Sequence, residues 1–466
     1  MKGLQAIGIT VMADDATLVE PVNFTLQPGL PLTLLGETGS GKSLLAQAVM
    51  GILPQGVQAS GTLIINGQYY QLPQDGAALR GLWGRTLASL PQEPWRALDP
   101  TMVIQQQVAE GYRFVRGHSD NRSEAAAQDD LEQLGLAASA LKYPWQLSGG
   151  MAQRAAFAAA RAGGAQILIA DEPTKGLDVS RRDEVSALLR REVAEGGTLL
   201  TITHDIALAR QLDGDIMVMH KGKVIEQGRA QQVLQMPAQR YTRELLAADP
   251  VNWPARQPAV IRSKPVVQAQ GIRLERGGKA LGVPENFTLH AGEIVGLQGA
   301  SGSGKSSFGD VLLGLLKPQQ GIITRLASAD RLKYQKIYQD PSALFPPVQT
   351  LAQSLDDVLR QHRIARLQRD KLMEQLALDA SLLTRRPDSL SGGELQRFSL
   401  LRVMLLEPVF LFADEPTSRL DPVVQQQTLQ LITGMAREQQ CAVLLVSHDR
   451  DLLEKSAHRV LAMQAA

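Results

Sequence analysis

Cysteine is almost absent from the sequence, which has one, Cys441, among 466 residues. A single thiol cannot form an internal disulfide, and it cannot supply a four-cysteine zinc site or an iron–sulfur cluster. Cys441 stands in the apolar run CAVLLVSHD, so we expect it to be a small buried side chain. Disulfide frameworks and cysteine metal centres are therefore excluded.

Long apolar runs are also absent. No eighteen consecutive residues are apolar, and the nearest approach, residues 155–170, is interrupted by Arg161 and two glycines. The first twenty residues hold a lysine but no continuous apolar segment behind it, which argues against a secretory signal. We expect a cytoplasmic chain that does not cross a membrane by itself.

Neither sign of charge is in excess, because 48 Lys and Arg balance 47 Asp and Glu to a net charge of +1. A chain that binds nucleic acid usually carries a basic excess, and a solvating tail carries an acidic one. The composition favours neither of these, and we expect no nucleic-acid partner.

An internal repeat is present. Three short blocks recur in the same order: NFTL at 23–26 and 286–289, LSGG at 147–150 and 390–393, and ADEPT at 170–174 and 413–417. Such a repeat indicates a duplicated domain, as the chain length also suggests. We expect domains at residues 1–248 and 266–466. Residues 249–265, with four prolines, predict a stiff, extended linker.

Each half alternates short apolar runs with helical patterns. LPLTLLG, QILIADEP and TLLTITHD in the first half correspond to EIVGLQG, VFLFADEP and AVLLVSHD in the second. Runs that are apolar on both faces and separated by helices predict strands of a buried, mostly parallel sheet. Residues 101–146 and 349–389 lack such runs and predict a helical insertion in each half. The predicted fold class is therefore α/β, in two tandem copies.

Two glycine-rich loops each follow a predicted strand, precede a predicted helix and fit G-x-x-x-x-G-K-S. The backbone N–H groups of such a loop surround phosphate oxygens, its lysine reaches the terminal phosphates, and its serine binds Mg²⁺. The two halves are thus predicted to be P-loop NTPase domains. The predicted nucleotide-binding residues are Gly36, Glu37, Thr38, Gly39, Ser40, Gly41, Lys42, Ser43 and Leu44, and Gly299, Ala300, Ser301, Gly302, Ser303, Gly304, Lys305, Ser306 and Ser307.

Two acids end an apolar strand in each half, in ILIADE and FLFADE. Burying carboxylates is costly unless a cation or hydrogen bonds compensate. We therefore assign Asp171 and Asp414, together with Ser43 and Ser306, to Mg²⁺ binding. Glu172 and Glu415 follow at the place where a water attacking the γ-phosphate could be polarised or deprotonated.

The LSGG blocks offer a further anion-binding element, because a serine hydroxyl and two glycine N–H groups meet at a helix start. The residues are Ser148, Gly149 and Gly150, and Ser391, Gly392 and Gly393. If each helical insertion projects away from its sheet, this element cannot readily serve the phosphate held by its own loop.

Six ordered motifs, present twice over essentially the whole chain, resemble the ATP-binding cassette (ABC) superfamily. They are the P-loop, a glutamine loop (Gln92, Gln339), the LSGG signature, the acid pair, an aspartate loop (Asp178, Asp421) and a switch histidine (His204, His448). The resemblance implies ATP and Mg²⁺ as cofactors, and catalytic and metal-binding roles for both glutamines. It implies that each histidine contacts the γ-phosphate.

In that superfamily two cassettes pair head to tail, so that the signature of one completes the ATP site of the other. Site one would then join Lys42, Ser43, Gln92, Asp171, Glu172 and His204 to Ser391, Gly392 and Gly393. Site two would join Lys305, Ser306, Gln339, Asp414, Glu415 and His448 to Ser148, Gly149 and Gly150. Neither set lacks a member, so we predict that both sites hydrolyse ATP.

The sequence departs from the superfamily pattern at two points. An aromatic residue about 25 positions before the P-loop usually stacks on adenine, yet residues 1–23 and 266–286 contain none. Phe24 and Phe287 are too close to the loops and are expected in the sheet core, which predicts weaker or less selective adenine recognition. The second copy also ends at RVLAMQAA, where the first continues through MVMHKGKVIEQG, so we expect it to lack the usual last strands.

GETGSGKSLLAQAVMGILP, YPWQLSGGMAQR and RYTRELL resemble the ATPases of bacterial dipeptide, oligopeptide and nickel importers, here with two subunits fused. The resemblance implies a peripheral protein on the cytoplasmic face of the inner membrane. It implies two integral-membrane permeases and an extracytoplasmic binding protein as partners, with a peptide, nickel or a metal chelate as cargo.

Two other classes stay open. A soluble twin-cassette ATPase acting on ribosomes or nucleic acid usually needs a long charged linker, zinc cysteines or a basic surface, whereas this chain has a short proline-rich linker and a net charge of +1. A non-catalytic interaction module conflicts with two intact sets of acids, and a measured basal ATPase activity would exclude it.

Overall fold

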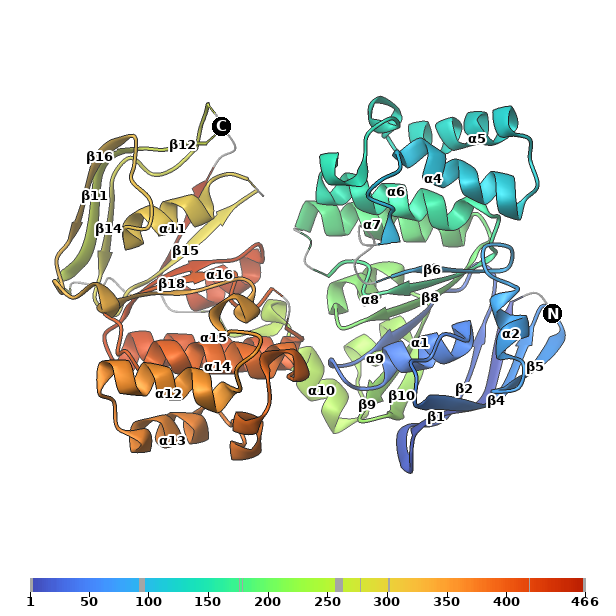
Figure 1. Ribbon diagram of the computed structural model, residues 1–466. Coiled ribbons are helices and arrows are strands. Elements are labelled where there is room, and N and C mark those ends of the chain that lie inside the picture. The colour runs from blue at the N-terminus through green and yellow to red at the C-terminus, as the bar shows by residue number, and fades with distance from the viewer. Residues whose placement is uncertain are drawn as a thin grey trace. The chain divides into compact units, whose positions relative to one another are not determined.

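The computed structural model describes residues 3–91, 97–175, 177, 179–255, 263–276, 278–300, 302–418 and 420–463. Contacts divide the chain into two compact units, Met1–Leu246 and Ala247–Ala466. Figure 1 shows that each unit contains sheets, helices packed on them and a separate group of helices. This arrangement confirms the predicted α/β fold class.

The central sheet of the first unit has the strand order β10-β9-β3-β8-β7-β6. All neighbouring pairs are parallel except β9 with β10. The strands are β3 (Leu32–Leu35), β6 (Leu87–Leu90), β7 (Ile167–Asp171), β8 (Thr198–Thr203), β9 (Asp215–His220) and β10 (Lys223–Arg229). Strands β3 and β8 are buried along their whole length, as predicted for a parallel sheet covered on both faces.

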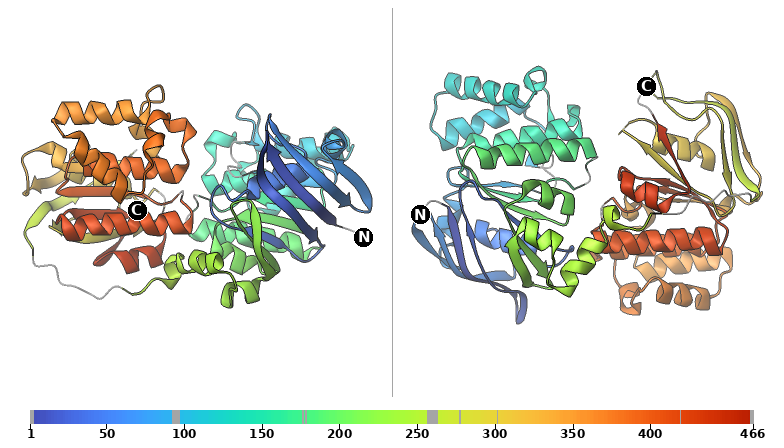
Figure 2. Two further views of the ribbon diagram at one scale, coloured as in Figure 1. Left: turned by 90° about the horizontal axis from the view of Figure 1, so that it is seen from below. Right: turned by 180° about the vertical axis from the view of Figure 1, so that it is seen from behind.

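An antiparallel sheet forms a second layer of the first unit, with the order β2-β1-β4-β5. Figure 2 shows these strands in blue. They are β1 (Leu4–Ala13), β2 (Ala16–Leu26), β4 (Val57–Ile65) and β5 (Gln68–Leu72). Helix α1 (Lys42–Met50) contributes Leu45 and Val49 to one core that also takes side chains from both sheets. The helix that follows the first glycine loop is therefore fixed between two sheets.

The remaining helices of the first unit flank the central sheet or form the predicted insertion. They are α2 (Gly76–Arg80), α4 (Ile104–Glu110), α5 (Asp120–Gln133), α6 (Gly149–Ala162), α7 (Val179–Ala194), α8 (Ile206–Leu212), α9 (Ala230–Gln235) and α10 (Arg240–Ala247). A π-helix, Gly111–Val115, follows α4, and two 3-10 helices, Ala137–Ser139 and Pro144–Gln146, follow α5. The described part of 101–146 contains no strand, which agrees with the prediction.

The second unit repeats this plan with a central sheet in the order β17-β18-β19-β15-β20, parallel throughout. Its strands are β15 (Ile294–Gly299), β17 (Tyr334–Ile337), β18 (Phe410–Asp414), β19 (Ala442–Val446) and β20 (Arg459–Met463). The antiparallel strands are β11 (Pro265–Arg273), β12 (Glu275–Arg276), β13 (Lys279–Ala280), β14 (Phe287–His290) and β16 (Gln320–Arg325). Helices are α11 (Lys305–Leu313), α12 (Leu351–His362), α13 (Arg366–Gln375), α14 (Gly392–Met404), α15 (Pro422–Glu438) and α16 (Arg450–Ser456).

The last strand of the second unit takes the place that β9 has in the first. Strand β20 pairs in parallel with β15, as β9 does with β3. The described residues of the second unit therefore include one of the closing strands, and they contain no counterpart of β10. We expected the second unit to lack both of these last strands. The structure instead has one of them, because the five residues RVLAM form β20.

The segment between the repeats is partly folded. Asp249 caps a 3-10 helix, Pro250–Asn252, which packs on α16, and Trp253 packs against the core of the second unit. Strand β11 already begins at Pro265. This differs from the extended linker that we expected over 249–265, because a proline at the first helical position and a half-buried indole favour local folding. Residues 256–262 of that segment lie outside the described residues.

The two phenylalanines and the cysteine discussed above are core residues. Phe24 and Phe287 are buried in the cores beneath the antiparallel sheets, as predicted. Cys441 is fully buried, and its burial raises the pKa of the thiol to about 12. A thiol that remains protonated in this way is unreactive, which agrees with a structural role.

Candidate active sites

Each glycine loop joins the end of a central strand to a helix, β3 to α1 and β15 to α11. Gly41 and Gly304 have φ of 99° and 100°, a left-handed conformation that side chains disfavour. A Cβ at Gly41 would also lie 2.9 Å from the Val19 side chain. Glycine is therefore required at this turn for the loop to reach the helix.

The two lysines of the loops are buried and held over backbone carbonyls. Lys42 Nζ donates to the carbonyls of Gly36 at 2.7 Å and Glu37 at 2.6 Å. Lys305 Nζ makes the same pair of contacts with Gly299 at 2.7 Å and Ala300 at 2.9 Å. A buried ammonium group at the start of a helix, held by backbone carbonyls of its own loop, is suited to binding an anionic phosphate.

A serine hydroxyl and a carboxylate meet beside each lysine. Ser43 Oγ donates to Asp171 Oδ1 at 3.2 Å, and Ser306 Oγ donates to Asp414 Oδ1 at 3.1 Å. Burial raises the pKa of both aspartates above the ordinary value, and the serine hydrogen bond opposes this. A buried carboxylate is costly unless a cation compensates its charge, and Mg²⁺ prefers oxygen ligands. The serine and aspartate oxygens therefore fit Mg²⁺.

The glutamate after each aspartate is paired with the predicted switch histidine. His204 Nδ1 lies 2.9 Å from Glu172 Oε1, and His448 Nε2 lies 2.6 Å from Glu415 Oε1. Both glutamates have left-handed backbone conformations, with φ of 48° and 49°. Strain of this kind in non-glycine residues is concentrated at functional sites.

Gln339 joins the second of these pairs, because its Nε2 donates to Glu415 Oε2 at 3.0 Å. The corresponding Gln92, Asp178 of the first aspartate loop and Ser301 of the second P-loop lie outside the described residues. Asp421 caps α15 by accepting from Val424 N–H at 3.0 Å. The structure thus brings lysine, serine, aspartate, glutamate and histidine together in both units, and the glutamine in the second.

The signature residues start the first helix after each insertion. Ser148 caps α6 by accepting from Met151 N–H, and Ser391 caps α14 by accepting from Glu394 N–H. A Cβ at Gly393 would lie 2.9 Å from Val424 Cγ1, so α14 and α15 need a glycine at their contact. The pairing of each signature with the P-loop of the other unit stays a prediction.

The loops fit a nucleoside triphosphate with Mg²⁺. The Ser303 hydroxyl of the second P-loop is buried and has no hydrogen-bond partner. An orphaned donor of this kind beside a buried lysine matches a phosphate oxygen. When bound, Mg²⁺ would neutralise charge on the terminal phosphates, and Ser43 with Asp171, and Ser306 with Asp414, are the groups that would hold it.

One contact at the first P-loop is not indicated by any sequence motif. Tyr241, in α10, accepts a hydrogen bond from Glu37 N–H at 3.2 Å, and its ring lies 4.0 Å from the His220 ring at the end of β9. Helix α10 is itself anchored because Glu226 accepts from the N–H groups of Ala238 and Gln239. The C-terminal helix of the first unit therefore fixes the conformation of its P-loop.

Replacing Tyr241 by Phe should lower the affinity of the first P-loop for ATP about 3- to 5-fold, because one hydrogen bond contributes about 1 kcal/mol. The measurement is binding of a fluorescent ATP analogue to a Lys305→Ala protein, in which only the first loop binds. Tyr69→Phe, at an exposed tyrosine, is the control. An unchanged affinity would mean that the contact does not hold the loop.

In each unit the phosphate-binding loop follows one parallel strand, and the acid pair stands at the end of the next strand but one in the sheet. This is the catalytic arrangement of P-loop ATPases. The fold and the two sites place the chain in this class, with the domain present twice. The sequence profile of the ABC transporter family matches residues 19–175 and 284–418. The chain belongs to the ABC transporter family and is an ATPase.

Two curated relatives extend over nearly the whole chain. The peptidoglycan transport ATP-binding protein YejF of Agrobacterium fabrum is 33% identical over 481 residues, which cover 96% of this chain and 87% of the relative. The glutathione import ATP-binding protein GsiA of Salmonella typhi is 33% identical over 510 residues, covering 96% and 81%. Among solved structures, an RNase-L inhibitor has a TM-score of 0.66 at 20% identity, covering 97% of this chain and 87% of its own; this likeness shows the fold alone.

Proposed function

We propose that this chain is the ATP-hydrolysing subunit of a bacterial ABC importer that takes up a small peptide-like solute. It would act with two separate permeases and an extracytoplasmic binding protein, at the cytoplasmic face of the inner membrane. The observation that carries this proposal is 33% identity over 96% of the chain to proteins named for glutathione import and peptidoglycan transport. Nickel or a metal chelate is the alternative cargo. No helix among the described residues is long and apolar enough to span a membrane.

The proposed chemistry uses the same groups in each unit. Lys42 binds the terminal phosphates, and Glu172 accepts the proton of the attacking water, while His204 holds that carboxylate in place. Burial, the largest single effect, raises the pKa of Glu172, but His204, Lys42 and Lys175 together lower this pKa below its ordinary value. Glu172 is therefore ionised at neutral pH and able to act as a base.

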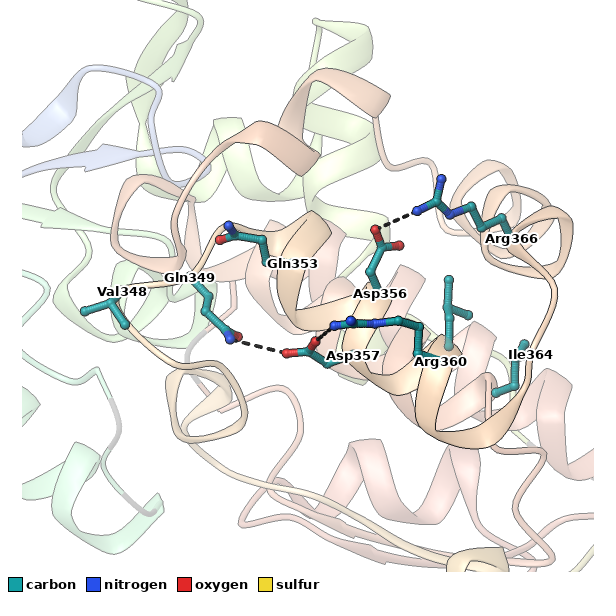
Figure 3. A pocket seen from close by; sticks show the side chains of 9 residues that line it. Val348, Gln349, Gln353, Asp356, Asp357, Arg360, Ile364 and Arg366 are labelled. Atoms are coloured by element: carbon teal, nitrogen blue, oxygen red, sulfur yellow. Dashed lines mark hydrogen bonds and ion pairs between the residues drawn. The ribbon is translucent and has the colours of Figure 1, made fainter.

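The helical insertion of the second unit contains a groove of about 670 Å³ that could receive a permease segment. Figure 3 shows its lining from the loop before α12, from α12 and from the start of α13. Asp356 pairs with Arg366 at 3.1 Å, and Gln349 donates to Asp357 at 3.3 Å. Val348 at the groove is 76% exposed. A polar lining with one exposed apolar side chain suits a short amphipathic helix.

The groove is connected to the catalytic acid through a short stretch of chain. Gln339, bonded to Glu415, is followed by a 3-10 helix, Pro341–Leu344, and by the buried Phe345. Three residues further on, the chain reaches Val348. A shift of Gln339 when ATP is bound or hydrolysed is therefore transmitted to the groove, which would couple hydrolysis to the permease.

Replacing Val348 by Glu should reduce capture of the permeases about tenfold, because it places a charge at the apolar contact. Capture is measured by affinity purification from detergent-solubilised membranes. Ile322→Glu, also at an exposed apolar residue of the second unit, is the matched control. Equal loss in both variants would show a general effect of charge rather than a docking surface.

The proposed function is tested by affinity purification of the tagged protein from solubilised host membranes. A Glu172→Gln, Glu415→Gln variant is included because it should retain ATP. Recovery of two polytopic permeases supports the importer, and their identity indicates the solute. Recovery of ribosomes or nucleic acid without a membrane protein would replace the proposal with the soluble twin-cassette alternative.

A further inference from the structure

A lysine lies directly beside the proposed Mg²⁺ ligand of the second unit. Lys336, in β17, is 10% exposed, and its Nζ lies 2.7 Å from Asp310 Oδ1 and 3.5 Å from Asp414 Oδ2. It also lies 4.9 Å from the centre of the Phe412 ring and 5.0 Å from that of Tyr338. The ammonium group is thus confined between two carboxylates and two aromatic rings.

The first unit has no charge at the corresponding positions. Ser89 pairs with Ile169 in the sheet as Lys336 pairs with Phe412, and Ile169 and Phe412 each precede the site aspartate by two residues. Gln47 follows the P-loop lysine by five residues, as Asp310 does in the second unit. A serine and a glutamine therefore stand where the second unit has a lysine and an aspartate.

A structural ion pair would explain Lys336 and Asp310 alone, but it does not explain the contact with Asp414. Through that contact the lysine already offsets the negative charge of Asp414, which Mg²⁺ would otherwise offset. A dication approaching Ser306 and Asp414 meets a fixed positive charge on the far side of the same carboxylate. Two cations near one partly buried carboxylate repel each other more strongly than they would in water.

We propose that Lys336 and Asp310 tune the second ATP site, so that it gains less from Mg²⁺ than the first site does. This proposal rests on the assignment of Asp414 as a metal ligand. The two sites of the chain are then unequal although both contain complete sets of catalytic residues. The second site requires a higher Mg²⁺ concentration to bind ATP as tightly as the first.

The test exchanges the two pairs. In a Lys42→Ala, Glu415→Gln protein only the second P-loop binds, and hydrolysis is suppressed. The readout is the ratio of the dissociation constants of a fluorescent ATP analogue with EDTA and with excess Mg²⁺. Adding Lys336→Ser and Asp310→Gln should raise this ratio about tenfold. Because both charges are removed together, neither Asp310 nor Lys336 is left buried without the other.

The reverse exchange keeps the proposal open to refutation if the first variant does not fold. Ser89→Lys with Gln47→Asp, in a Lys305→Ala, Glu172→Gln protein, should lower the ratio at the first site about tenfold. An unchanged ratio in the folded exchange variants overturns the proposal. Circular dichroism shows which variants are folded.

Asp414→Asn separates this proposal from the site assignment. If Asp414→Asn leaves the ratio unchanged, Asp414 does not bind the metal and the assignment itself is wrong. If Asp414→Asn lowers the ratio but the exchange of Lys336 and Asp310 does not change it, only the tuning by the lysine is wrong. Neither result depends on the permeases, so failure of the importer proposal is detected independently.

Discussion

Replacing both Glu172 and Glu415 by Gln is expected to reduce ATP hydrolysis at least about 100-fold while ATP binding is retained. Each amide keeps the shape of the side chain and the contact to its histidine, but it cannot accept the proton of the attacking water. The lysines and serines that are proposed to hold the nucleotide are unchanged. The measurement is phosphate release at saturating ATP, with nucleotide binding measured in parallel.

The single variants test whether both sites work. Both units bring the lysine, serine, aspartate, glutamate and histidine together. Each single substitution should therefore lower the rate of ATP hydrolysis, and the double substitution should nearly abolish it. Glu184→Gln, at a glutamate paired with Arg154 outside the site, is the matched control. A double variant with the wild-type rate would show that neither glutamate is the base.

The lowered pKa of Glu172 gives this activity a pH dependence of known sign. A carboxylate whose pKa is depressed remains ionised above that pKa and loses its charge only as the pH falls through it. Protonation of Glu172 should therefore not limit hydrolysis between about pH 6 and 8. If the hydrolysis rate at the first site falls near neutral pH because Glu172 becomes protonated, the pairing of Glu172 with His204 is contradicted.

The central sheets and the loops could be predicted from the sequence because their determinants are local. A run such as QILIADEP predicts, within one segment, a strand that is buried on both faces and ends in acids. The structure has β7 and Asp171 at those positions. The glycine loops are likewise complete in eight residues. Because the domain is duplicated, each of these patterns occurs twice in the sequence.

The antiparallel sheets were not predicted, because their strands lack a clean period. The pairing of β1 with β2 contains three register shifts, and exposed residues interrupt the apolar alternation. Contacts between distant residues were also missed. Tyr241 meets Glu37 across 204 positions, and Lys336 meets Asp414 from a different strand. No spacing rule in one sequence indicates such pairs.

These distant contacts explain how two units with the same motifs can differ. At the first P-loop a tyrosine of α10 contacts the loop, and at the second a lysine approaches Asp414, the proposed metal ligand. Both residues lie next to the proposed catalytic groups without being part of the motifs. We therefore expect the duplicated motifs to specify the reaction, and residues outside the motifs to determine how each site performs it.

Replacing Gly309 by Ala is expected to destabilise the second unit by about 2–3 kcal/mol, although alanine normally stabilises a helix relative to glycine by about 1 kcal/mol. Gly309 lies in α11, and a methyl group there would overlap the ring of Phe412, which is fully buried in β18. Neither the helix between its two sheets nor the central strand can move away without disturbing the core. Thermal unfolding should show a midpoint lowered by about 5–10 °C.

The first unit supplies the compensating change. Its equivalents of Gly309 and Phe412 are Ala46 and Ile169, both buried in one core, so a larger residue on the helix is matched by a smaller one on the strand. Gly309→Ala with Phe412→Ile should therefore recover most of the stability lost in Gly309→Ala. Ala46→Gly should instead cost about 1 kcal/mol, because it removes a methyl group and loosens the helix without relieving any overlap. If the double variant is no more stable than Gly309→Ala, the loss does not come from the overlap with Phe412, and the two units do not pack their loop helices by exchange of volume between helix and strand.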